Sequence, residues 1–474
     1  MIGDELRYQI LRAFNHPPTR EQEQALQVFA DFMTCRDSRA VMVLRGSAGT
    51  GKTTLAGAIV RGMTSLRQKL VLLAPTGRAA KVFSLYAGSP AYTIHRRIYR
   101  QRSMMGGFEL NFNAAHDTLF IVDEASMIAN GDSPLLDDLI SFVYQKDCRL
   151  LLIGDSAQLP PVGETESPAL QTGVLRGYGL EVFESNLIEV LRQSQESGIL
   201  WNATSIRNLS SLPPRILLNG FSDIRVVPGD ELIESLATSY SRAGLDDTIV
   251  ITRSNKRANI YNEGIRRTVL DHDDELCRGD RLMIVKNNYY WMSQGNLVPR
   301  TSNLEPRNTA MPFIANGDMA VVQRVRNIHE LYGFRFAEVT MTFPDYDDYE
   351  LTATTLLDTL TSEAPALTRE QQEQLFSRVM EDYADIPLKA DRMKKLKEDR
   401  YFNALQVKFA YAVTCHKAQG GQWAHVYLDQ GYMTDDMLTP DYLHWLYTAF
   451  TRATDQLFLV NWPKAQIEEG KKTE

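Results

Sequence analysis

The feature that most constrains this 474-residue chain is a short glycine-rich segment near residue 50. Residues 46–53 read GSAGTGKT, which fits the phosphate-binding pattern G-x-x-x-x-G-K-[ST]. An apolar run at 40–44 precedes the segment, and a helix-like run at 54–67 follows it. Glycines let the backbone approach phosphates, and a helix N-terminus adds a positive end. A chance match in a glycine turn is the alternative, but the strand–loop–helix context favours nucleotide binding.

This loop gives the first set of expected ligand contacts. Lys52 is expected to reach the β- and γ-phosphates of ATP, and the Thr53 hydroxyl is expected to bind Mg²⁺. The loop residues expected to hold the nucleotide are Gly46, Ser47, Ala48, Gly49, Thr50, Gly51, Lys52, Thr53 and Thr54.

A second signal lies at residues 119–124, which read LFIVDE. An apolar strand that ends in two carboxylates is typical of the magnesium side of such sites. Asp123 is expected to hold Mg²⁺ through the water shell of the metal, and Glu124 to orient or deprotonate the attacking water. Alone, the pair is more typical of a solvated turn; together with the upstream loop it indicates catalysis.

The pattern of apolar runs predicts an α/β fold. Runs at 40–44, 70–74, 119–122 and 150–153 are short, bounded by polar or Gly/Pro residues, and separated by helix-like segments, which is typical of a parallel sheet buried on both faces. Further strands are expected at 248–252, 426–428 and 457–460. Residues 281–285, 320–325 and 334–343 instead look like short strands separated by turns, which indicates a small β-barrel. Residues 366–400 look helical and highly charged.

The composition limits the kinds of binding site and the cellular location that we expect. The net charge of −8 argues against a protein held on nucleic acid mainly by bulk charge, although a local basic groove is compatible with it. The four cysteines form no C-x-x-C pair, so neither a zinc site nor a disulfide framework is expected. No run approaches the length of a membrane span, and the N-terminus does not resemble a signal peptide. We expect a soluble, cytoplasmic protein.

Further motifs make the chain resemble the superfamily 1 helicases, closest to the RecD-like and Dda-like group (superfamily 1B). The resemblance runs from about residue 17 to 462, with the motifs in family order. The most specific segments are 152–163 (LIGDSAQLPPVG), 413–420 (VTCHKAQG) and 446–453 (LYTAFTRA). Weaker matches are 19–22 (TREQ), 74–81 (APTGRAAK), 93–95 (TIH) and 191–193 (LRQ).

The resemblance implies roles for individual residues. Gln22 would read the adenine edge, and Gly420 would lie near the nucleotide. Gln158 would sense the γ-phosphate, and Arg192 and Arg452 would contact it, so the implied catalytic set is Lys52, Glu124, Gln158, Arg192 and Arg452. The implied DNA contacts are Pro75, Thr76, His95, Phe108, Thr414 and His416.

The resemblance also implies an architecture of two RecA-like domains with parallel sheets, an inserted SH3-like barrel and a small hairpin, the pin. The expected first RecA-like domain spans 1–88 and 118–182, with the pin at 89–117. The second spans 183–279 and 401–474, and the barrel with its helical extension spans 280–400. Tyr99, Phe108 and Phe112 are the aromatic candidates for a strand-separating wedge, since aromatic rings stack on bases; they can equally anchor the hairpin. For the basic side chains of 392–397 a solvated helix face is favoured.

The function implied is ATP-dependent travel along single-stranded DNA in the 5′-to-3′ direction with unwinding of duplex. The implied cofactors are ATP and Mg²⁺, and the partners are single-stranded DNA and junctions of single- and double-stranded DNA, met by a monomer without membrane contact. The alternatives are a DNA-stimulated regulatory ATPase without unwinding activity, and an RNA or DNA helicase of opposite polarity. A small kinase shares the phosphate loop but has no use for segments 152–163, 413–420 and 446–453.

Overall fold

The computed structural model describes residues 2–101, 108–131, 134–190, 196–209, 213–293 and 314–468. The chain divides into two compact units. The first unit comprises Met1–Arg100, Leu110–Gly229 and Ala418–Glu474, and the second comprises Gln101–Glu109 and Asp230–Lys417. No helix in the described ranges is both long and apolar enough to cross a membrane.

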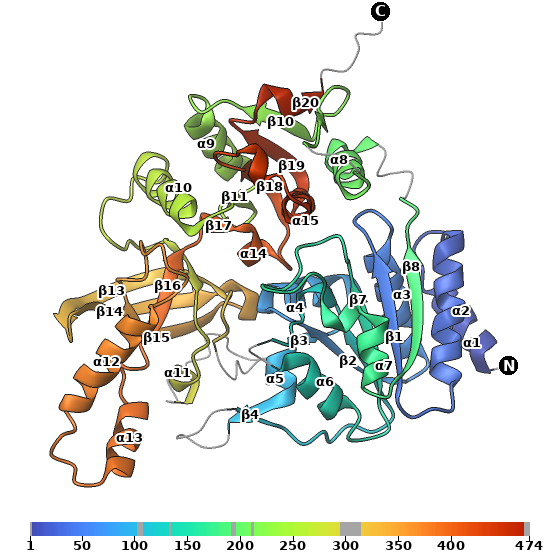
Figure 1. The fold of residues 1–474 in the computed structure, drawn as a ribbon, viewed down its shortest axis with the longest axis horizontal. Coiled ribbons are helices and arrows are strands. Elements are labelled where there is room, and N and C mark those ends of the chain that lie inside the picture. Colours follow the sequence, from blue (N-terminus) through green and yellow to red (C-terminus); the bar gives the residue numbers. More distant parts are fainter. Residues whose placement is uncertain are drawn as a thin grey trace, which may run out of the picture. The chain divides into compact units, whose positions relative to one another are not determined.

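The first unit contains a six-stranded parallel sheet in the order β3-β2-β6-β7-β1-β8 (Figure 1). Its strands are β1 (Ala40–Gly46), β2 (Lys69–Ala74), β3 (Ala91–Thr93), β6 (Thr118–Val122), β7 (Arg149–Gly154) and β8 (Glu181–Leu187). The four apolar runs expected to form this sheet are β1, β2, β6 and β7, so that prediction is confirmed.

Alternate residues of the inner strand β1, which lies between β7 and β8, enter two separate cores. Met42 and Leu44 pack among helices α1 (Ile2–Arg12), α2 (Arg20–Thr34), α3 (Lys52–Ser65) and α4 (Gly77–Ala87). Val41 and Val43 pack with α5 (Ile94–Ile98), α6 (Leu135–Val143) and α7 (Thr172–Gly177) on the other face. Full burial stabilises each such side chain by about 1.5–3 kcal/mol, which is why β1 is apolar from Ala40 to Leu44.

The first unit also contains three strands that pair in parallel in the order β10-β19-β18. They are β10 (Ile224–Val227), β18 (Trp423–Asp429) and β19 (Ala453–Val460), and the last two match the strands expected at 426–428 and 457–460. The nearby elements are α8 (Gly198–Arg207), α15 (Pro440–Phe450) and the short parallel pair β9 (Ile216–Leu217) and β20 (Ile467–Glu468).

A two-stranded sheet lies where the pin was expected. It consists of β4 (Tyr99–Gln101) and β5 (Phe108–Leu110). At its base the Asn111 N–H donates to the Ile98 carbonyl oxygen at 2.6 Å.

The second unit is built around a closed five-stranded barrel (Figure 1). Its strands are β12 (Arg281–Ile284), β13 (Met319–Leu331), β14 (Phe334–Phe343), β15 (Tyr349–Leu356) and β16 (Leu405–Phe409). The barrel expected from the sequence is therefore present, and it includes a strand beyond residue 400. All neighbours are antiparallel except β15 and β16, which run parallel.

The remaining elements of the second unit precede, interrupt or follow the barrel strands in the chain. Strands β11 (Thr248–Thr252) and β17 (Ala412–Thr414) pair in parallel. The helices are α9 (Leu232–Arg242), α10 (Asn255–Thr268), α11 (Tyr290–Ser293), α12 (Arg369–Glu381), α13 (Lys389–Lys397) and α14 (Cys415–Ala418), the last of which ends in the first unit. Helices α12 and α13 occupy the segment that was expected to be helical and charged, and Leu375, Val379 and Leu396 pack them against the outside of β14 and β15.

Candidate nucleotide-binding site

The glycine-rich loop joins the carboxyl end of β1 to the amino end of α3. Gly49 and Gly51 have φ angles of 79° and 77°, in the left-handed region that favours glycine. Gly51 is the N-cap of α3 and forms no side-chain cap, so the first-turn N–H groups of α3 are not satisfied by a capping side chain. Lys52 begins the helix, and its Nζ donates to the Gly46 carbonyl oxygen at 2.8 Å. This loop therefore has the shape and donors of an anion-binding turn.

Asp123 follows β6 at the same edge of the sheet. Its backbone N–H donates to the Leu73 carbonyl oxygen at 2.9 Å, and its Oδ1 accepts the Glu124 N–H at 2.9 Å. The Tyr86 hydroxyl of α4 donates to Asp123 Oδ2. Burial and the neighbouring Glu124 carboxylate raise the pKa of Asp123 to about 6, although Lys52 opposes this shift. Tyr86 was not among the residues expected from the sequence.

Glu124 occupies a strained position beside Asp123. Its φ of 52° lies in the left-handed region, which costs a residue with a side chain about 1–2 kcal/mol. Its Oε2 is buried without a hydrogen-bond partner among the described residues, and the same holds for Oε1 of Gln158. Buried oxygens without hydrogen-bond donors are rare in proteins, and these two can accept a hydrogen bond from a ligand.

A magnesium ion fits this donor set. Mg²⁺ prefers hard oxygen ligands, usually one or two protein groups with several waters. The Asp123 carboxylate and the Thr53 hydroxyl would hold it, and the ion would supply positive charge that neutralises the phosphates. These two assignments stay predictions.

The turn at 155–159 contacts the helix α15 through several hydrogen bonds within the first unit. The Tyr447 hydroxyl donates to Asp155 Oδ2 at 2.6 Å, and the Leu159 N–H donates to Thr448 Oγ1 at 2.7 Å. Gln419 Nε2 donates to the Leu159 carbonyl oxygen at 2.7 Å. Residues from three of the motif segments, 152–163, 418–420 and 446–453, thus lie together within the first unit.

The two expected arginine contacts have different outcomes. Arg452 is buried, and its guanidinium donates to Thr448 O at 3.0 Å, Gly421 O at 3.1 Å and Thr451 Oγ1 at 3.1 Å. In this structure it therefore ties α15 to the segment after Gly420. Arg192 lies outside the described residues.

Gln22 is hydrogen-bonded to the glycine-rich loop and to Thr19 in its own helix cap. Its Nε2 donates to the Gly51 carbonyl oxygen at 3.2 Å. Its Oε1 accepts the Thr19 N–H at 2.9 Å, which completes a capping box at the start of α2. Adenine recognition by Gln22 stays a prediction, and the capping role is an observed one.

Gly420 contacts α4 and its N-cap. A Cβ on Gly420 would lie 2.9 Å from Ala79 Cβ and 3.1 Å from Thr76 Oγ1, and its φ is 72°. Both the space and the backbone therefore require glycine here. This packing explains the glycine without a nucleotide, so its expected place near ATP also stays a prediction.

The expected DNA contacts lie at loop ends and helix starts. Pro75 and Thr76 are half-buried, and the Thr76 hydroxyl caps α4 by accepting the Ala79 N–H at 3.2 Å. His95 is half-buried in α5, and burial lowers its pKa. In the second unit Thr414 ends β17 and His416 is exposed on α14. The Phe108 side chain lies outside the described residues.

The other two aromatic candidates for a wedge differ in exposure. The Tyr99 hydroxyl donates to Asp138 Oδ2 at 2.6 Å, and the side chain is half-buried. Phe112 is 62% exposed. Tyr99 thus anchors the base of the hairpin, whereas the ring of Phe112 is exposed and has Lys146 Nζ 5.0 Å from its centroid.

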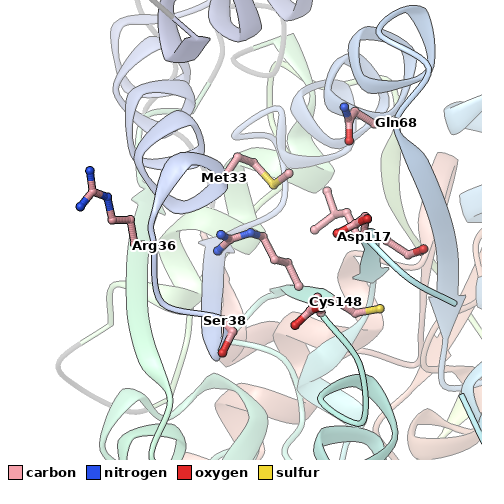
Figure 2. A pocket seen from close by; sticks show the side chains of 10 residues that line it. Met33, Arg36, Ser38, Gln68, Asp117 and Cys148 are labelled. Carbon is pink, nitrogen blue, oxygen red and sulfur yellow. The ribbon is translucent and has the colours of Figure 1, made fainter.

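A cavity of about 320 Å³ in the first unit lies at the opposite edge of the sheet (Figure 2). Thr118 and Arg149, which line it, begin β6 and β7, whereas the glycine-rich loop follows the carboxyl end of β1. Arg149 is held by backbone carbonyls of Phe32 and Cys35. The cavity is therefore separate from the nucleotide site.

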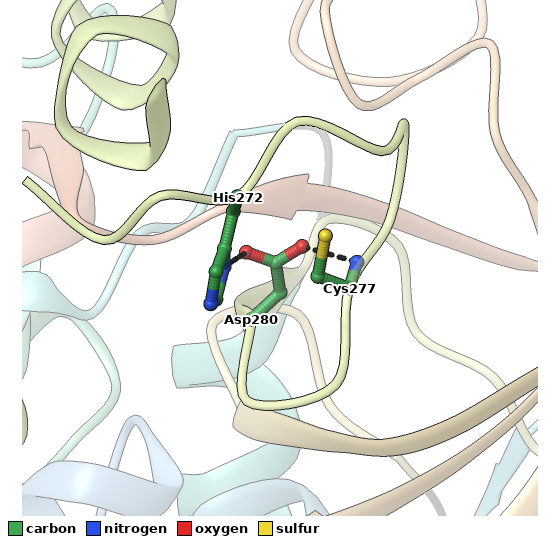
Figure 3. Close-up of side chains that lie close together, drawn as sticks. All are labelled: His272, Cys277 and Asp280. Atoms are coloured by element: carbon green, nitrogen blue, oxygen red, sulfur yellow. Dashed lines mark hydrogen bonds and ion pairs between the residues drawn. The ribbon is translucent and has the colours of Figure 1, made fainter. Parts of the chain in front are cut away.

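His272, Cys277 and Asp280 lie close together in the second unit (Figure 3). The Asp280 carboxylate is fully buried and already has partners on both oxygens. Oδ1 accepts from Arg266 Nε and the Tyr411 hydroxyl and lies 2.9 Å from His272 Nδ1, and Oδ2 accepts from Arg266 Nη2 and the Cys277 N–H. Burial alone would raise the pKa of Asp280, but these hydrogen bonds lower it overall. Because the carboxylate is saturated and neutralised by Arg266, the cluster is a structural hub and not a metal site.

Comparisons with known proteins agree with the motif order. Residues 19–202 match the family model described as an AAA domain, and residues 409–460 match a UvrD-like helicase C-terminal domain. The chain is 40% identical over 124 residues to an ATP-dependent RecD2 DNA helicase of Deinococcus radiodurans, covering 26% of this chain and 16% of that protein. It is 26% identical over 261 residues to the ATP-dependent DNA helicase dda of Enterobacteria phage T4, covering 52% of this chain and 57% of that protein.

The chain thus spans less than two thirds of the length of these two relatives. Among solved structures, a Pif1 helicase from Bacteroides in complex with ADP-AlF3 and ssDNA aligns with 95% of this chain and 94% of its own, at 14% identity and a TM-score of 0.46.

Proposed function

We propose that this chain, which belongs to the RecD-like superfamily 1B helicases, is an ATP-driven DNA helicase that travels 5′ to 3′ along single-stranded DNA and unwinds duplex. The observation that carries the proposal is the meeting of three segments at one edge of the six-stranded sheet. They are the glycine-rich loop, the pair Asp123–Glu124 and the turn that holds Gln158. Helix α15 is hydrogen-bonded to both the loop and that turn.

Hydrolysis follows from the chemistry of these groups. Lys52 and the N–H groups of the loop bind the phosphates, and Thr53 and Asp123 hold Mg²⁺. Glu124, whose Oε2 is buried without a recorded donor, accepts a proton from the attacking water. Arg452 and Arg192 stabilise charge on the transferred phosphoryl group. For Arg452 this requires release of at least one of its present hydrogen bonds.

Coupling to DNA is proposed through the segments on either side of α4 and β17. Thr76 caps the helix whose last turn carries Tyr86, and Tyr86 contacts Asp123. The contacts to single-stranded DNA from the first unit would be made by Pro75, Thr76 and His95. Those from the second unit would be made by Thr414 and His416. Phe108 and the exposed ring of Phe112 would meet the duplex end, since base–aromatic stacking contributes about 1–3 kcal/mol per base.

The test is ATP hydrolysis with and without single-stranded DNA, followed by unwinding of duplexes that carry either a 5′ or a 3′ overhang. We expect hydrolysis to be stimulated by DNA, unwinding to require the 5′ overhang, and Lys52→Ala to lose both activities. Lys256→Ala, which changes an exposed lysine in the second unit, is the matched control and should keep both.

The outcomes separate the alternatives. Stimulated hydrolysis without unwinding would indicate a regulatory ATPase, and unwinding from the 3′ overhang would reverse the polarity. A preference for RNA in the same assay would replace the substrate. Hydrolysis indifferent to every nucleic acid would overturn the motor.

A further inference from the structure

Tyr447 of α15 connects two parts of the nucleotide site through its hydroxyl group. The side chain is 2% exposed. The hydroxyl lies 2.8 Å from the Ala48 backbone nitrogen in the glycine-rich loop and 2.6 Å from Asp155 Oδ2. Because the Ala48 N–H is a donor, the single hydroxyl proton must point to Asp155. The hydroxyl therefore accepts from the loop and donates to Asp155 at the same time.

Asp155 is hydrogen-bonded in turn to the backbone of the turn that carries Gln158. Its Oδ1 accepts the Ala157 N–H at 3.0 Å, and its carbonyl oxygen accepts the Gln158 N–H at 3.2 Å. Asp155 is itself 2% exposed. A shift of the Tyr447 hydroxyl thus changes the partner of a buried carboxylate that shapes this turn.

Arg452, two residues beyond the end of α15, contacts the chain just after the segment expected to face DNA. Arg452 donates to Gly421 O at 3.1 Å, and Gln419 donates to Leu159 O at 2.7 Å. Movement of residues 419–421 would therefore shift Arg452 at the end of α15 and Leu159 in the 155–159 turn. Of these contacts, the one at Ala48 reaches the glycine-rich loop.

We propose that the Tyr447 hydroxyl is a positioning group that couples the glycine-rich loop to α15, so that DNA-driven movement of α15 changes how the loop holds ATP. This inference rests on the proposed function and adds a named residue to it. Tyr447 does not take part in bond breaking; it sets the position of the Ala48 N–H and of Asp155.

The test compares Tyr447→Phe with Tyr442→Phe in the full chain. Both substitutions remove one buried hydroxyl from α15 and keep the ring, but the Tyr442 hydroxyl donates to Gln430 Oε1 at 2.6 Å, away from the loop. The first readout is hydrogen exchange at the Ala48 amide. We expect exchange to rise about five- to tenfold in Tyr447→Phe, as loss of one net hydrogen bond predicts, and to stay unchanged in Tyr442→Phe.

The second readout is hydrolysis with and without single-stranded DNA. We expect Tyr447→Phe to keep basal hydrolysis within about threefold, because only one hydrogen bond is lost, and to lose most of the DNA stimulation. Tyr442→Phe should be normal in both. Unchanged Ala48 exchange overturns the inference whatever the DNA result. So does an equal fall in basal and stimulated rates, or the same loss in Tyr442→Phe. If DNA does not stimulate hydrolysis in the unmodified protein, the proposed function is refuted instead. The exchange measurement then still shows whether the Tyr447 hydroxyl holds the Ala48 amide.

Discussion

Two buried carboxylate clusters in this protein are built in opposite ways. In the second unit every oxygen of Asp280 has donors, Arg266 supplies a counter-charge, and the pKa is lowered. In the first unit the pKa of Asp123 is raised to about 6, and its neighbour Glu124 combines a left-handed backbone with an oxygen that has no recorded partner in the described ranges. Satisfied buried charges specify and hold a structure, whereas unsatisfied ones keep capacity for a ligand.

The largest expected effect is on the saturated cluster. Asp280→Asn leaves the Arg266 guanidinium buried without its counter-charge, so we expect the free energy of unfolding to fall by about 3–5 kcal/mol. Urea denaturation measures this. Arg369→Gln breaks an exposed pair with Glu373, 93% and 67% exposed, and should cost less than about 0.5 kcal/mol. A loss as small as the control would show that Asp280 does not act as a hub.

Substitution in the Asp123–Glu124 cluster should change activity rather than stability. Glu124→Gln removes the proposed proton acceptor, so we expect hydrolysis to fall about 100-fold or more. The free energy of unfolding should stay within about 0.5 kcal/mol of the unmodified protein, since a nearly isosteric amide disturbs little packing. Steady-state hydrolysis and denaturation on the same preparations check both parts. Hydrolysis that survives the substitution would remove Glu124 from the mechanism.

A third buried carboxylate, Asp318 in the barrel, is intermediate between these two, because it has hydrogen-bond donors but no counter-charge among the described residues. Its oxygens accept the Ala315 N–H and the Tyr346 hydroxyl, and no salt bridge to it is recorded within the described residues. Burial, with a smaller contribution from the Asp345 charge, raises its pKa to about 7. The folded state therefore binds a proton that the unfolded state releases between about pH 4 and pH 7, and stability falls as pH rises through this window.

We expect the unmodified protein to lose about 2–3 kcal/mol of stability from this residue between pH 5 and pH 7. Asp318→Asn should lack that loss, so its stability relative to the unmodified protein should increase with pH. Denaturation at both pH values measures the difference. Parallel pH profiles for the two proteins would contradict the raised pKa.

The smallest expected effect isolates the backbone strain at Glu124. Because φ is 52°, glycine is favoured there over any residue with a Cβ. We expect Glu124→Gly to be more stable than Glu124→Ala by about 1 kcal/mol, although both lose hydrolysis. If alanine proved equally stable, the left-handed backbone at this site would not be strained.

The four inner strands of the six-stranded sheet could be read from the sequence, and its edge strands β3 and β8 could not. Strands β1, β2, β6 and β7 give apolar runs because both faces are covered. Strand β8 (EVFESNL) lies at an edge of the sheet with three exposed residues, so polar side chains interrupt its pattern. In the barrel, β15 (YELTATTL) is rich in threonine and gives a similarly weak signal.

The site divides in the same way. The glycine-rich loop and Asp123–Glu124 were readable because their chemistry is contained in a few consecutive residues. Tyr447 and Ala48 are 399 positions apart, and nothing in either segment indicates the other. The capping box of Gln22 was not expected, although the pattern Thr-x-x-Gln before an apolar helix is its signature.

The order of strands in the first unit has a consequence for synthesis. The six-stranded sheet uses residues 40–187, so it can assemble as soon as this stretch has left the ribosome. Strand β10, at 224–227, must wait for β19, at 453–460, which is made more than two hundred residues later. During that interval the glycine-rich loop is folded, but the hydroxyl that holds its Ala48 amide has not yet been translated. A nascent chain stalled before residue 440 should therefore present the phosphate loop without its partner from α15.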